Sequence, residues 1–208
     1  MTKTHYHERT LVLIKPDAVQ RALIGEILAR FERKGLKIVA MKMVWPTKQL
    51  AKEHYGWSEK EKRESGERTI QGYQEKGMEP PLGGDPIKIA ENTMRKLVSY
   101  ISAGPVVALV IEGAHAIANV RKIRGGTNPT MADAGTITAD YSIDSYFISD
   151  DADRAVRNLV HASGNSAEAE REIKLWFKEN EIVDYDLAIE KILYDKEWED
   201  AMKQLVKA

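Results

Sequence analysis

The chain has 208 residues, of which 43% are hydrophobic and 30% are charged, and its formal net charge is −1. This length allows one domain with a sizeable core, and the near-neutral charge argues against a protein that binds nucleic acid or an anionic membrane over a broad basic surface. Cysteine is absent, which excludes disulfides and thiolate chemistry, and no apolar run approaches the roughly 18–20 residues of a membrane span. We therefore expect a cytoplasmic protein.

Strand and helix patterns alternate at the start of the chain. A β-branched run at 10–14 predicts a buried strand that ends directly before Lys15. Apolar residues then recur at helical spacing over 24–31, and a second strand is predicted over 36–45. A short helix is expected at 47–55, because its first residue is a threonine that can cap it.

The segment near 57–92 differs in composition. It is charged, rich in glycine and proline, and has little apolar periodicity, so we expect an inserted surface element, part loop and part weak helix. A second insertion is expected near 143–154, and a helical tail from about 186. The first insertion could act as a lid, as a contact between subunits or as plain surface. The second insertion and the tail could block or replace an interface between subunits, and the sequence leaves these alternatives open.

The second half of the chain returns to regular patterns. A helical stretch at 94–101 leads into the clearest strand, 104–113, whose continuous apolar run suits a central position in a sheet. A short helix at 114–126, a long irregular loop at 127–142 and a short strand at 158–161 are expected next. A glutamate-rich helix follows.

Without the insertions, strand and helix alternate four times. This order favours an α+β fold, namely a ferredoxin-like βαββαβ sandwich with an antiparallel four-stranded sheet. We expect a single domain over 1–208.

The usual nucleotide-binding and metal-binding motifs are absent from the sequence. There is no G-x-x-x-x-G-K-[ST], no G-x-G-x-x-G after a strand, no H-R-D or D-F-G, and no H-E-x-x-H. A protein with this sequence that handles phosphate does so without a glycine-rich cradle.

Several basic residues nevertheless suit a phosphate. Arg121 and Arg124 are three residues apart on a predicted helix and so share a face, and Thr127 follows with a hydroxyl. Lys15 stands at the end of a strand. Arginine binds oxyanions through a planar fork and lysine as a compact charge. Taken alone, the same residues would also fit a solvated basic surface.

The candidate nucleophile is His161, in "RNLVHASGNSAEAEREI". A neutral imidazole can attack phosphorus near neutral pH, since its unperturbed pKa is about 6.5. A carboxylate on the other ring nitrogen would help, and the following helix offers Glu168, Glu170 and Glu172. Asn165 can cap that helix. A structural histidine that closes a strand is the alternative.

These motifs together resemble the nucleoside diphosphate kinase family. The resemblance rests on "RTLVLIKPDAVQRALIGEIL", "FERKGLKIVAMKM", "KEHY", "GPVVALVIEG", "GGTNP" with "GTI", "RNLVHAS", "AEREIKLWF" and "EIVDY". They occur in the family's order along nearly the whole chain. The N-x-x-H-x-S pattern, with the "KPD" and "TNP" elements, is specific.

The resemblance implies transfer of the γ-phosphate from a nucleoside triphosphate, typically ATP, to a nucleoside diphosphate, which maintains NTP and dNTP pools. His161 would carry the phosphate in a ping-pong reaction, Glu172 would hold its other ring nitrogen, and Ser163 would support that pair. The residues implied to hold the nucleotide are Lys15, Tyr55, Arg121, Thr127 and Asn158.

The family also implies a cofactor and an assembly. Mg²⁺ is expected on the nucleotide phosphates, with no protein ligand, because it favours phosphate and water. A homo-oligomer built from a dimer is expected, with no specific nucleic acid and no membrane as partner.

The sequence departs from the family pattern at two places. Thr138 in "GTITAD" stands where the family usually has a phosphate-binding arginine, and we hypothesise that Arg124 replaces that cation. The aromatic platform for the base falls near Thr93, so it is missing or supplied by another side chain. Tyr73 and Trp57 are the candidates.

Two other functions stay open. A non-enzymatic relative that binds nucleotides without turnover is kept in view by the departures at Thr138 and Thr93, although the retained His161 and Glu172 favour an enzyme. A ferredoxin-like RNA-binding module would need aromatic and basic strand motifs, and none is visible.

Overall fold

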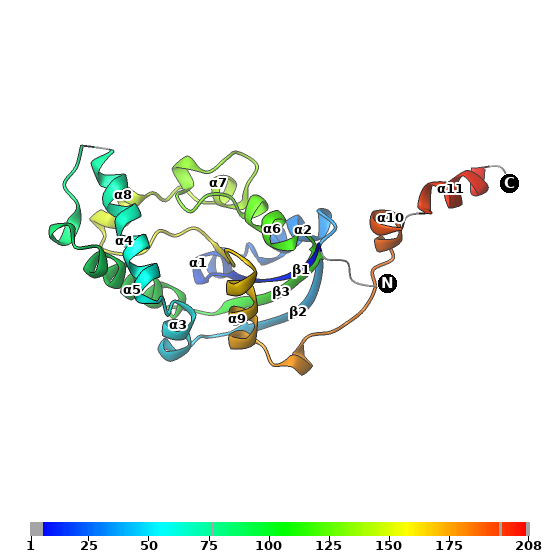
Figure 1. The fold of residues 1–208 in the computed structure, drawn as a ribbon, viewed down its shortest axis with the longest axis horizontal. Coiled ribbons are helices and arrows are strands. Elements are labelled where there is room, and N and C mark those ends of the chain that lie inside the picture. Colours follow the sequence, from blue (N-terminus) through cyan, green and yellow to red (C-terminus); the bar gives the residue numbers. More distant parts are fainter. Residues whose placement is uncertain (1–5, 76, 196, 207–208) are drawn as a thin grey trace.

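A four-stranded antiparallel sheet forms the centre of the molecule in the computed structural model, which describes residues 6–75, 77–195 and 197–206. Its strands are β1 (His7–Ile14), β2 (Lys37–Val44), β3 (Val106–Ala114) and β4 (Val160–Ala162), in the order β2-β3-β1-β4. The predicted α+β sandwich with an antiparallel sheet is confirmed (Figure 1).

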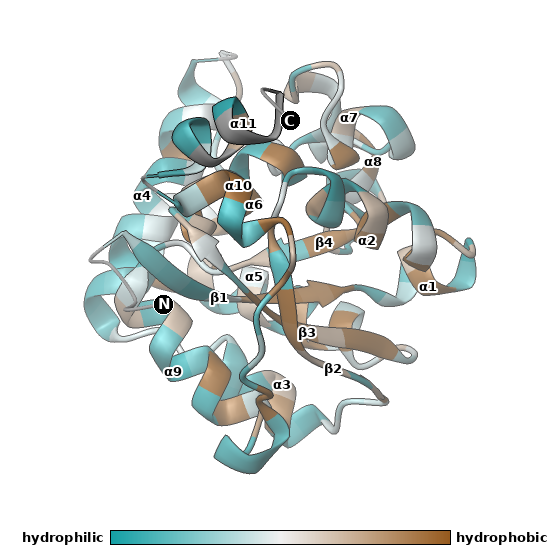
Figure 2. Ribbon diagram, turned by 90° about the vertical axis from the view of Figure 1, so that its right-hand side faces the viewer, coloured by the Kyte–Doolittle hydropathy of each residue, from teal (hydrophilic) through white to brown (hydrophobic). Residues whose placement is uncertain are grey.

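Helices cover both faces of the sheet. One face carries α1 (Pro16–Gln20), α2 (Ile24–Arg33) and α6 (Ala116–Arg124), and the other carries α3 (Lys48–His54), α5 (Pro86–Ile101) and α9 (Ser166–Trp176). Because side chains alternate along a strand, β1 serves both layers: Val12 and Ile14 lie in one apolar cluster, and Leu11 and Leu13 in the other. Figure 2 shows the strands as the apolar centre between more polar helices.

The segment expected to be part loop and part weak helix is more regular than predicted. Helix α4 (Glu59–Gln74) begins at a capping box formed by Ser58 and Glu61 and packs along α5. A short 3-10 helix, η1 (Pro81–Gly84), leads into α5. Helix α5 starts at Pro86, eight residues before the predicted 94, because Asp85 caps it through the Ile87 and Lys88 amides. The helix boundaries expected here from apolar periodicity were wrong, since capping residues set them.

The close packing of α4 on α5 depends on Gly66. A β-carbon at this position would lie 2.0 Å from the carbonyl oxygen of Pro86. Only glycine lets the two helix backbones approach this closely.

Short helices also interrupt the second half of the chain. The loop expected to be irregular at 127–142 contains η2 (Pro129–Met131) and α7 (Ile137–Tyr141), the latter capped by Thr136. Helix α8 (Tyr146–Asp151) follows before β4. After α9 come η3 (Glu179–Glu181), α10 (Glu190–Tyr194) and α11 (Trp198–Val206). No helix among the described residues is long and apolar enough to cross a membrane.

The C-terminal segment is attached to the sheet by a buried charge cluster. The Lys37 ammonium lies 3.1 Å from Glu112 and 3.0 Å from Glu190, and its side chain is 5% exposed. The amide of Val183 donates to the Val39 carbonyl on the outer edge of β2 at 2.8 Å. These contacts hold α10 against the sheet, whereas α11 projects beyond the body of the molecule (Figure 1).

Candidate active site

The site is built around the pair formed by His161 and Glu172. Strand β4 pairs with β1 so that Val160 and Ala162 enter the α1/α2/α6 layer, which turns His161 toward α3 and α9. Its Nε2 lies 2.9 Å from Glu172 Oε2, and the Ser163 hydroxyl donates to the same oxygen at 2.7 Å. Of the three glutamates considered on α9, Glu172 is the one at this position.

The start of α9 places Glu172 beside the histidine. The Asn165 side chain accepts a hydrogen bond from the Glu168 amide, and Glu168 accepts one from the Gly164 amide. This capping holds the first turn of the helix close to the end of β4. Glu172 lies one turn further on, 3% exposed, and faces His161.

The Glu172 contact determines the protonation pattern of the imidazole. A carboxylate accepts hydrogen bonds, so Nε2 carries the proton and Nδ1 keeps a free electron pair. Burial, followed by the charges of Lys15 and Arg124, holds the pKa of His161 well below 6.5. Burial raises the pKa of Glu172, while the Ser163 hydrogen bond and the charge of Arg171 oppose that rise. A neutral His161 with a free Nδ1 is a nucleophile.

A cluster of cations faces this nucleophile. Lys15 is 5% exposed and donates to Asn158 Oδ1 at 2.7 Å, and its ammonium lies 5.1 Å from the centre of the Tyr100 ring. Arg124 is 9% exposed, donates to the Thr127 hydroxyl at 2.9 Å, and has a buried Nε with no hydrogen-bond partner.

No described carboxylate forms a direct ion pair with these cations, although the charge of Asp17 acts on Lys15. Within the part of the chain that the structure describes, Lys15, Arg121 and Arg124 form no ion pair with a carboxylate. Burial, and then the charge of Arg124, lowers the pKa of Lys15 to about 7. Burial and the neighbouring Arg121 lower the pKa of Arg124. Cations held together without a carboxylate in direct contact form a site for an anion.

Asn158 joins the two sides of this cluster. Its Oδ1 accepts from Lys15, and its Nδ2 donates to the Thr127 carbonyl at 3.0 Å. It therefore connects the end of β1 to the loop after α6. Asn158 is 3% exposed, and through these two hydrogen bonds it positions the lysine and this loop.

The sequence reading missed His54 and Trp176. The His54 ring lies 4.4 Å from the His161 ring, centre to centre, and its Nδ1 accepts a hydrogen bond from Trp176 Nε1 at 3.3 Å. Burial, followed by the charge of His161, places the pKa of His54 well below 6.5, so it is neutral. A signal was present, because His54 directly precedes Tyr55 in "KEHY". Tyr55 is 6% exposed, its hydroxyl has no hydrogen-bond partner, and burial raises its pKa.

Three side chains of the site carry atoms that can ligate a metal ion. His54, His161 and Glu172 offer donor atoms within 4.8 Å of one another. However, Trp176 occupies His54 Nδ1, and Glu172 already holds His161 Nε2. Neutral His54 then carries its proton on Nε2, which has no hydrogen-bond partner, so His161 Nδ1 is the one nitrogen of the two rings with a free electron pair. This arrangement fits a nucleophile better than a metal centre.

Among the described residues, no hydrogen bond or ring contact joins the other residues singled out from the sequence to His161 or Glu172. Thr93 is in the middle of α5 and donates to the Ile89 carbonyl at 3.0 Å, while Tyr73 on α4 donates to Asp150 on α8 at 2.6 Å. Trp57 is half-buried at the turn before α4. Thr138 is fully buried near the start of α7, and its hydroxyl has no hydrogen-bond partner.

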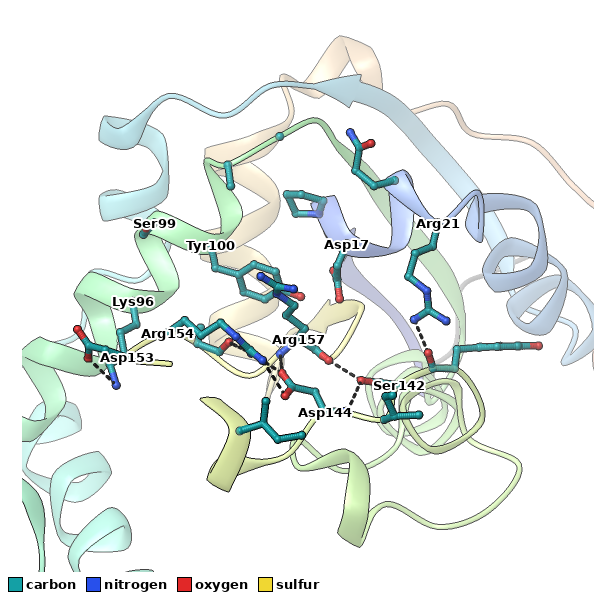
Figure 3. A pocket seen from close by; sticks show the side chains of 18 of the residues that line it. Asp17, Arg21, Lys96, Ser99, Tyr100, Ser142, Asp144, Asp153, Arg154 and Arg157 are labelled. Atoms are coloured by element: carbon teal, nitrogen blue, oxygen red, sulfur yellow. Dashed lines mark hydrogen bonds and ion pairs between the residues drawn. The ribbon is translucent and has the colours of Figure 1, made fainter. Parts of the chain in front are cut away.

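One cavity near the cation cluster does not have His161 in its lining. It measures about 1020 Å³ and lies between α1, α5 and the 141–157 segment (Figure 3). Tyr100 lines this cavity and also lies under the Lys15 ammonium. The cavity therefore adjoins the Lys15 side of the cation cluster and does not adjoin His161.

Comparison with known proteins agrees with this geometry. The family model "Nucleoside diphosphate kinase" matches residues 8–71 and 88–182. A nucleoside diphosphate kinase of Pyrobaculum aerophilum is 46% identical over 180 residues, which cover 85% of this chain and 98% of that protein. One from Pyrococcus abyssi is 45% identical over 181 residues, 87% of this chain and 91% of that protein.

Solved structures give the same result. The crystal structure of an NDP kinase from Pyrobaculum aerophilum has a TM-score of 0.81 and 44% identity, and the match covers 86% of this chain and all of that one. A nucleoside diphosphate kinase from Borrelia burgdorferi, with vanadate and ADP bound as a transition-state mimic, has a TM-score of 0.74 and 36% identity over 91% of this chain and 98% of that one. The resemblance seen in the sequence is confirmed: the chain belongs to the nucleoside diphosphate kinase family.

Proposed function

We propose that this protein transfers the γ-phosphate of a nucleoside triphosphate, typically ATP, to a nucleoside diphosphate through a phosphohistidine on His161. The observation that carries the proposal is a neutral histidine, held at Nε2 by Glu172, beside buried cations that form no direct ion pair with a carboxylate. Family membership supports it, as does the vanadate and ADP bound to the Borrelia burgdorferi relative.

The reaction has two matching halves. In the first, the Nδ1 electron pair of His161 attacks the γ-phosphorus, an N–P bond forms, and the bond to the β-phosphate oxygen breaks, so the diphosphate leaves. Glu172 stabilises the positive charge that the ring acquires. In the second half, a terminal oxygen of another nucleoside diphosphate attacks the same phosphorus and the N–P bond breaks. No further reactant is needed.

The cation cluster would stabilise the transferring group. Charge spreads over the equatorial oxygens during phosphoryl transfer, so positioned cations account for most of the catalysis. Lys15 and Arg124 are the buried cations, and Arg121 is the exposed one. Thr127 and Asn158 would hold phosphate or ribose oxygens. The Tyr55 hydroxyl is a buried donor without a hydrogen-bond partner in the protein.

Mg²⁺ would be carried by the nucleotide. Glu172 is engaged by His161 and Ser163, and one oxygen of Asp17 accepts from the Leu159 amide while the other is buried without a hydrogen-bond partner. This leaves phosphate and water as ligands, which Mg²⁺ prefers. When bound, the ion would neutralise part of the phosphate charge.

A homo-oligomer and a cytoplasmic location belong to the same proposal. Edge strand β2 and the residue after it expose Met41, Met43 and Trp45, which are 58%, 60% and 67% exposed. An apolar strip on an open sheet edge suits a second copy of the chain. Sedimentation of a monomer at micromolar concentration would contradict this part.

The lack of cysteine suits the cytoplasm.

Phosphoenzyme formation tests the proposal directly. Protein mixed with γ-labelled ATP and Mg²⁺ should acquire an acid-labile label, and an added nucleoside diphosphate should remove it as labelled triphosphate. His161→Ala should not label, whereas His115→Ala, which changes a histidine outside the site, should label as the unchanged protein does. Nucleotide binding without labelling would favour the non-enzymatic alternative.

Arg124 is expected to replace the cation that Thr138 does not supply. Arg124→Ala should lower kcat/KM at least tenfold, because loss of a charged contact to phosphate costs about 1.5–3 kcal/mol. Lys122→Ala, on the same helix but exposed, is the control and should stay within twofold. Steady-state kinetics measure kcat/KM of each variant, and thermal melting verifies that each variant is folded. An Arg124→Ala enzyme within twofold of the original would end the compensation hypothesis.

The rate should depend on pH through Lys15 and His161. Since the pKa of Lys15 is lowered to about 7 and only its protonated form attracts phosphate, kcat/KM should fall as pH rises through about 7. His161 attacks only when neutral, and its pKa lies well below 6.5, so the acid limb should lie below pH 6.5. Lys15→Arg keeps its charge at every pH tested and should lose the alkaline limb. An unchanged alkaline limb in this variant would assign it to another group.

A further inference from the structure

Glu172 uses only one of its two carboxylate oxygens to hold His161. Oε2 lies 2.9 Å from His161 Nε2 and accepts from the Ser163 hydroxyl at 2.7 Å. The other oxygen, Oε1, lies 3.8 Å from His54 Nδ1. That nitrogen already accepts a hydrogen bond from Trp176 Nε1 and has no proton to donate. Oε1 therefore gains no hydrogen bond from the histidine beside it.

Arg171 places a positive charge beside this second oxygen. A terminal nitrogen of its guanidinium lies 3.6 Å from Glu172 Oε1. This distance is longer than a hydrogen bond, so the contact is one between charges. Among the described residues, Arg171 is the one arginine or lysine that forms an ion pair with Glu172. The carboxylate is thus held by the nucleophile on one oxygen and faces a cation on the other.

The same guanidinium reaches the end of α3. It donates to the His54 carbonyl at 3.4 Å and to the Glu53 carbonyl at 3.3 Å. The last carbonyls of a helix lack partners within the helix, so an arginine there acts as a cap. Helices α3 and α9 lie side by side on this face of the sheet (Figure 2). Arg171 therefore joins Glu172 to the turn that carries His54 and Tyr55.

That turn borders the nucleophile. The ring centre of His54 lies 4.4 Å from that of His161, and the ring centre of Tyr55 lies 6.4 Å from it. A side chain that fixes both this turn and the Glu172 carboxylate can hold the imidazole in one orientation from two sides.

Resting on the proposed function, we propose that Arg171 is a positioning residue, which holds the Glu172 carboxylate through the oxygen that His161 does not use and joins it to the end of α3. The imidazole gains positive charge as the N–P bond forms, and an ionised Glu172 stabilises that charge. Burial favours the neutral form of Glu172 and raises its pKa, and the charge of Arg171 opposes this rise.

The other titratable and charged groups around the pair come from three further elements. They are His54 and Tyr55 at the end of α3, Lys15 at the end of β1, and Arg121 and Arg124 on α6. Burial holds the pKa of His54 well below 6.5 and raises the pKa of Tyr55, so both are neutral near pH 7. The cations on β1 and α6 act on His161 whether or not Arg171 is present.

The pH dependence of phosphoenzyme formation tests the proposal. Burial raises the pKa of Glu172 and lowers that of His161, and the charge of Arg171 lowers both. The reaction needs an ionised Glu172 and a neutral His161, so the rate falls as pH drops through these pKa values. Arg171→Gln keeps a donor for the α3 carbonyls but removes the charge. It should move the acid limb of the labelling rate up by about 0.5 pH unit, with KM for Mg·ATP within about twofold.

Three further variants separate charge from packing. Arg171→Lys keeps the charge, and its acid limb should lie within about 0.2 pH unit of the original. Arg171→Met is a second uncharged variant and should reproduce the shift. Lys174→Met is the matched control, because it removes one charge from the same helix at a side chain that is 73% exposed and pairs with Glu170. Its acid limb should not move, and thermal melting shows that each variant is folded.

The outcomes distinguish this inference from the proposed function. An acid limb that stays in place in Arg171→Gln and Arg171→Met overturns the inference. An equal loss of rate at every pH in Arg171→Gln and Arg171→Lys also overturns it, since Arg171 would then only cap α3. An unchanged protein that takes no label would remove the proposed function instead. The NMR signals of the His161 ring, followed against pH without nucleotide, test the contact in that case. Protonation at higher pH in Arg171→Gln is expected, and protonation at the same pH overturns the inference.

Discussion

The hydrogen bond between His161 and Glu172 is the interaction on which the rest of the site depends. It assigns the proton to Nε2 and leaves the electron pair on Nδ1, so one carboxylate determines which atom can react. Two unrelated parts of the fold must meet to make it. Pairing of β4 with β1 turns the histidine toward α9, and the Asn165 cap fixes where α9 begins. Ser163 and the buried Trp176–His54 pair then restrict how the carboxylate and the ring can move.

The cation cluster is electrostatically costly for the folded protein. Lys15 and Arg124 are buried without a carboxylate partner, which destabilises the folded state, and the lowered pKa values of both groups are the consequence. An incoming polyphosphate relieves this cost, because it supplies the missing negative charge. Folding therefore places the cations where phosphate binding needs them, at a cost to the stability of the folded state. Burial of the two apolar layers on either side of the sheet offsets this cost. The same cations disfavour a protonated His161, so the site that attracts phosphate also keeps its nucleophile neutral.

The sequence was sufficient for the fold and for the residues closest to the chemistry. Apolar alternation and short β-branched runs predicted the sheet. "RNLVHAS" with its glutamate-rich helix predicted a carboxylate beside His161 but left three glutamates open, and the family resemblance implied Glu172, which contacts His161 in the structure. The family identification rested on those same motifs. What sequence reasoning missed depends on contacts between distant segments. The tautomer of His54 is determined by Trp176, more than a hundred residues away, and the extent of α4 by a capping serine in a stretch without apolar periodicity.

The position of the phosphate on the imidazole is the most direct test of this account. The Glu172 contact leaves Nδ1 as the attacking atom. Phosphorus NMR of the denatured phosphoenzyme, compared with the two phosphohistidine isomers as standards, distinguishes the ring nitrogens. The account predicts a single species with phosphate on Nδ1 of His161. Phosphate on Nε2, or on a residue other than His161, would contradict it.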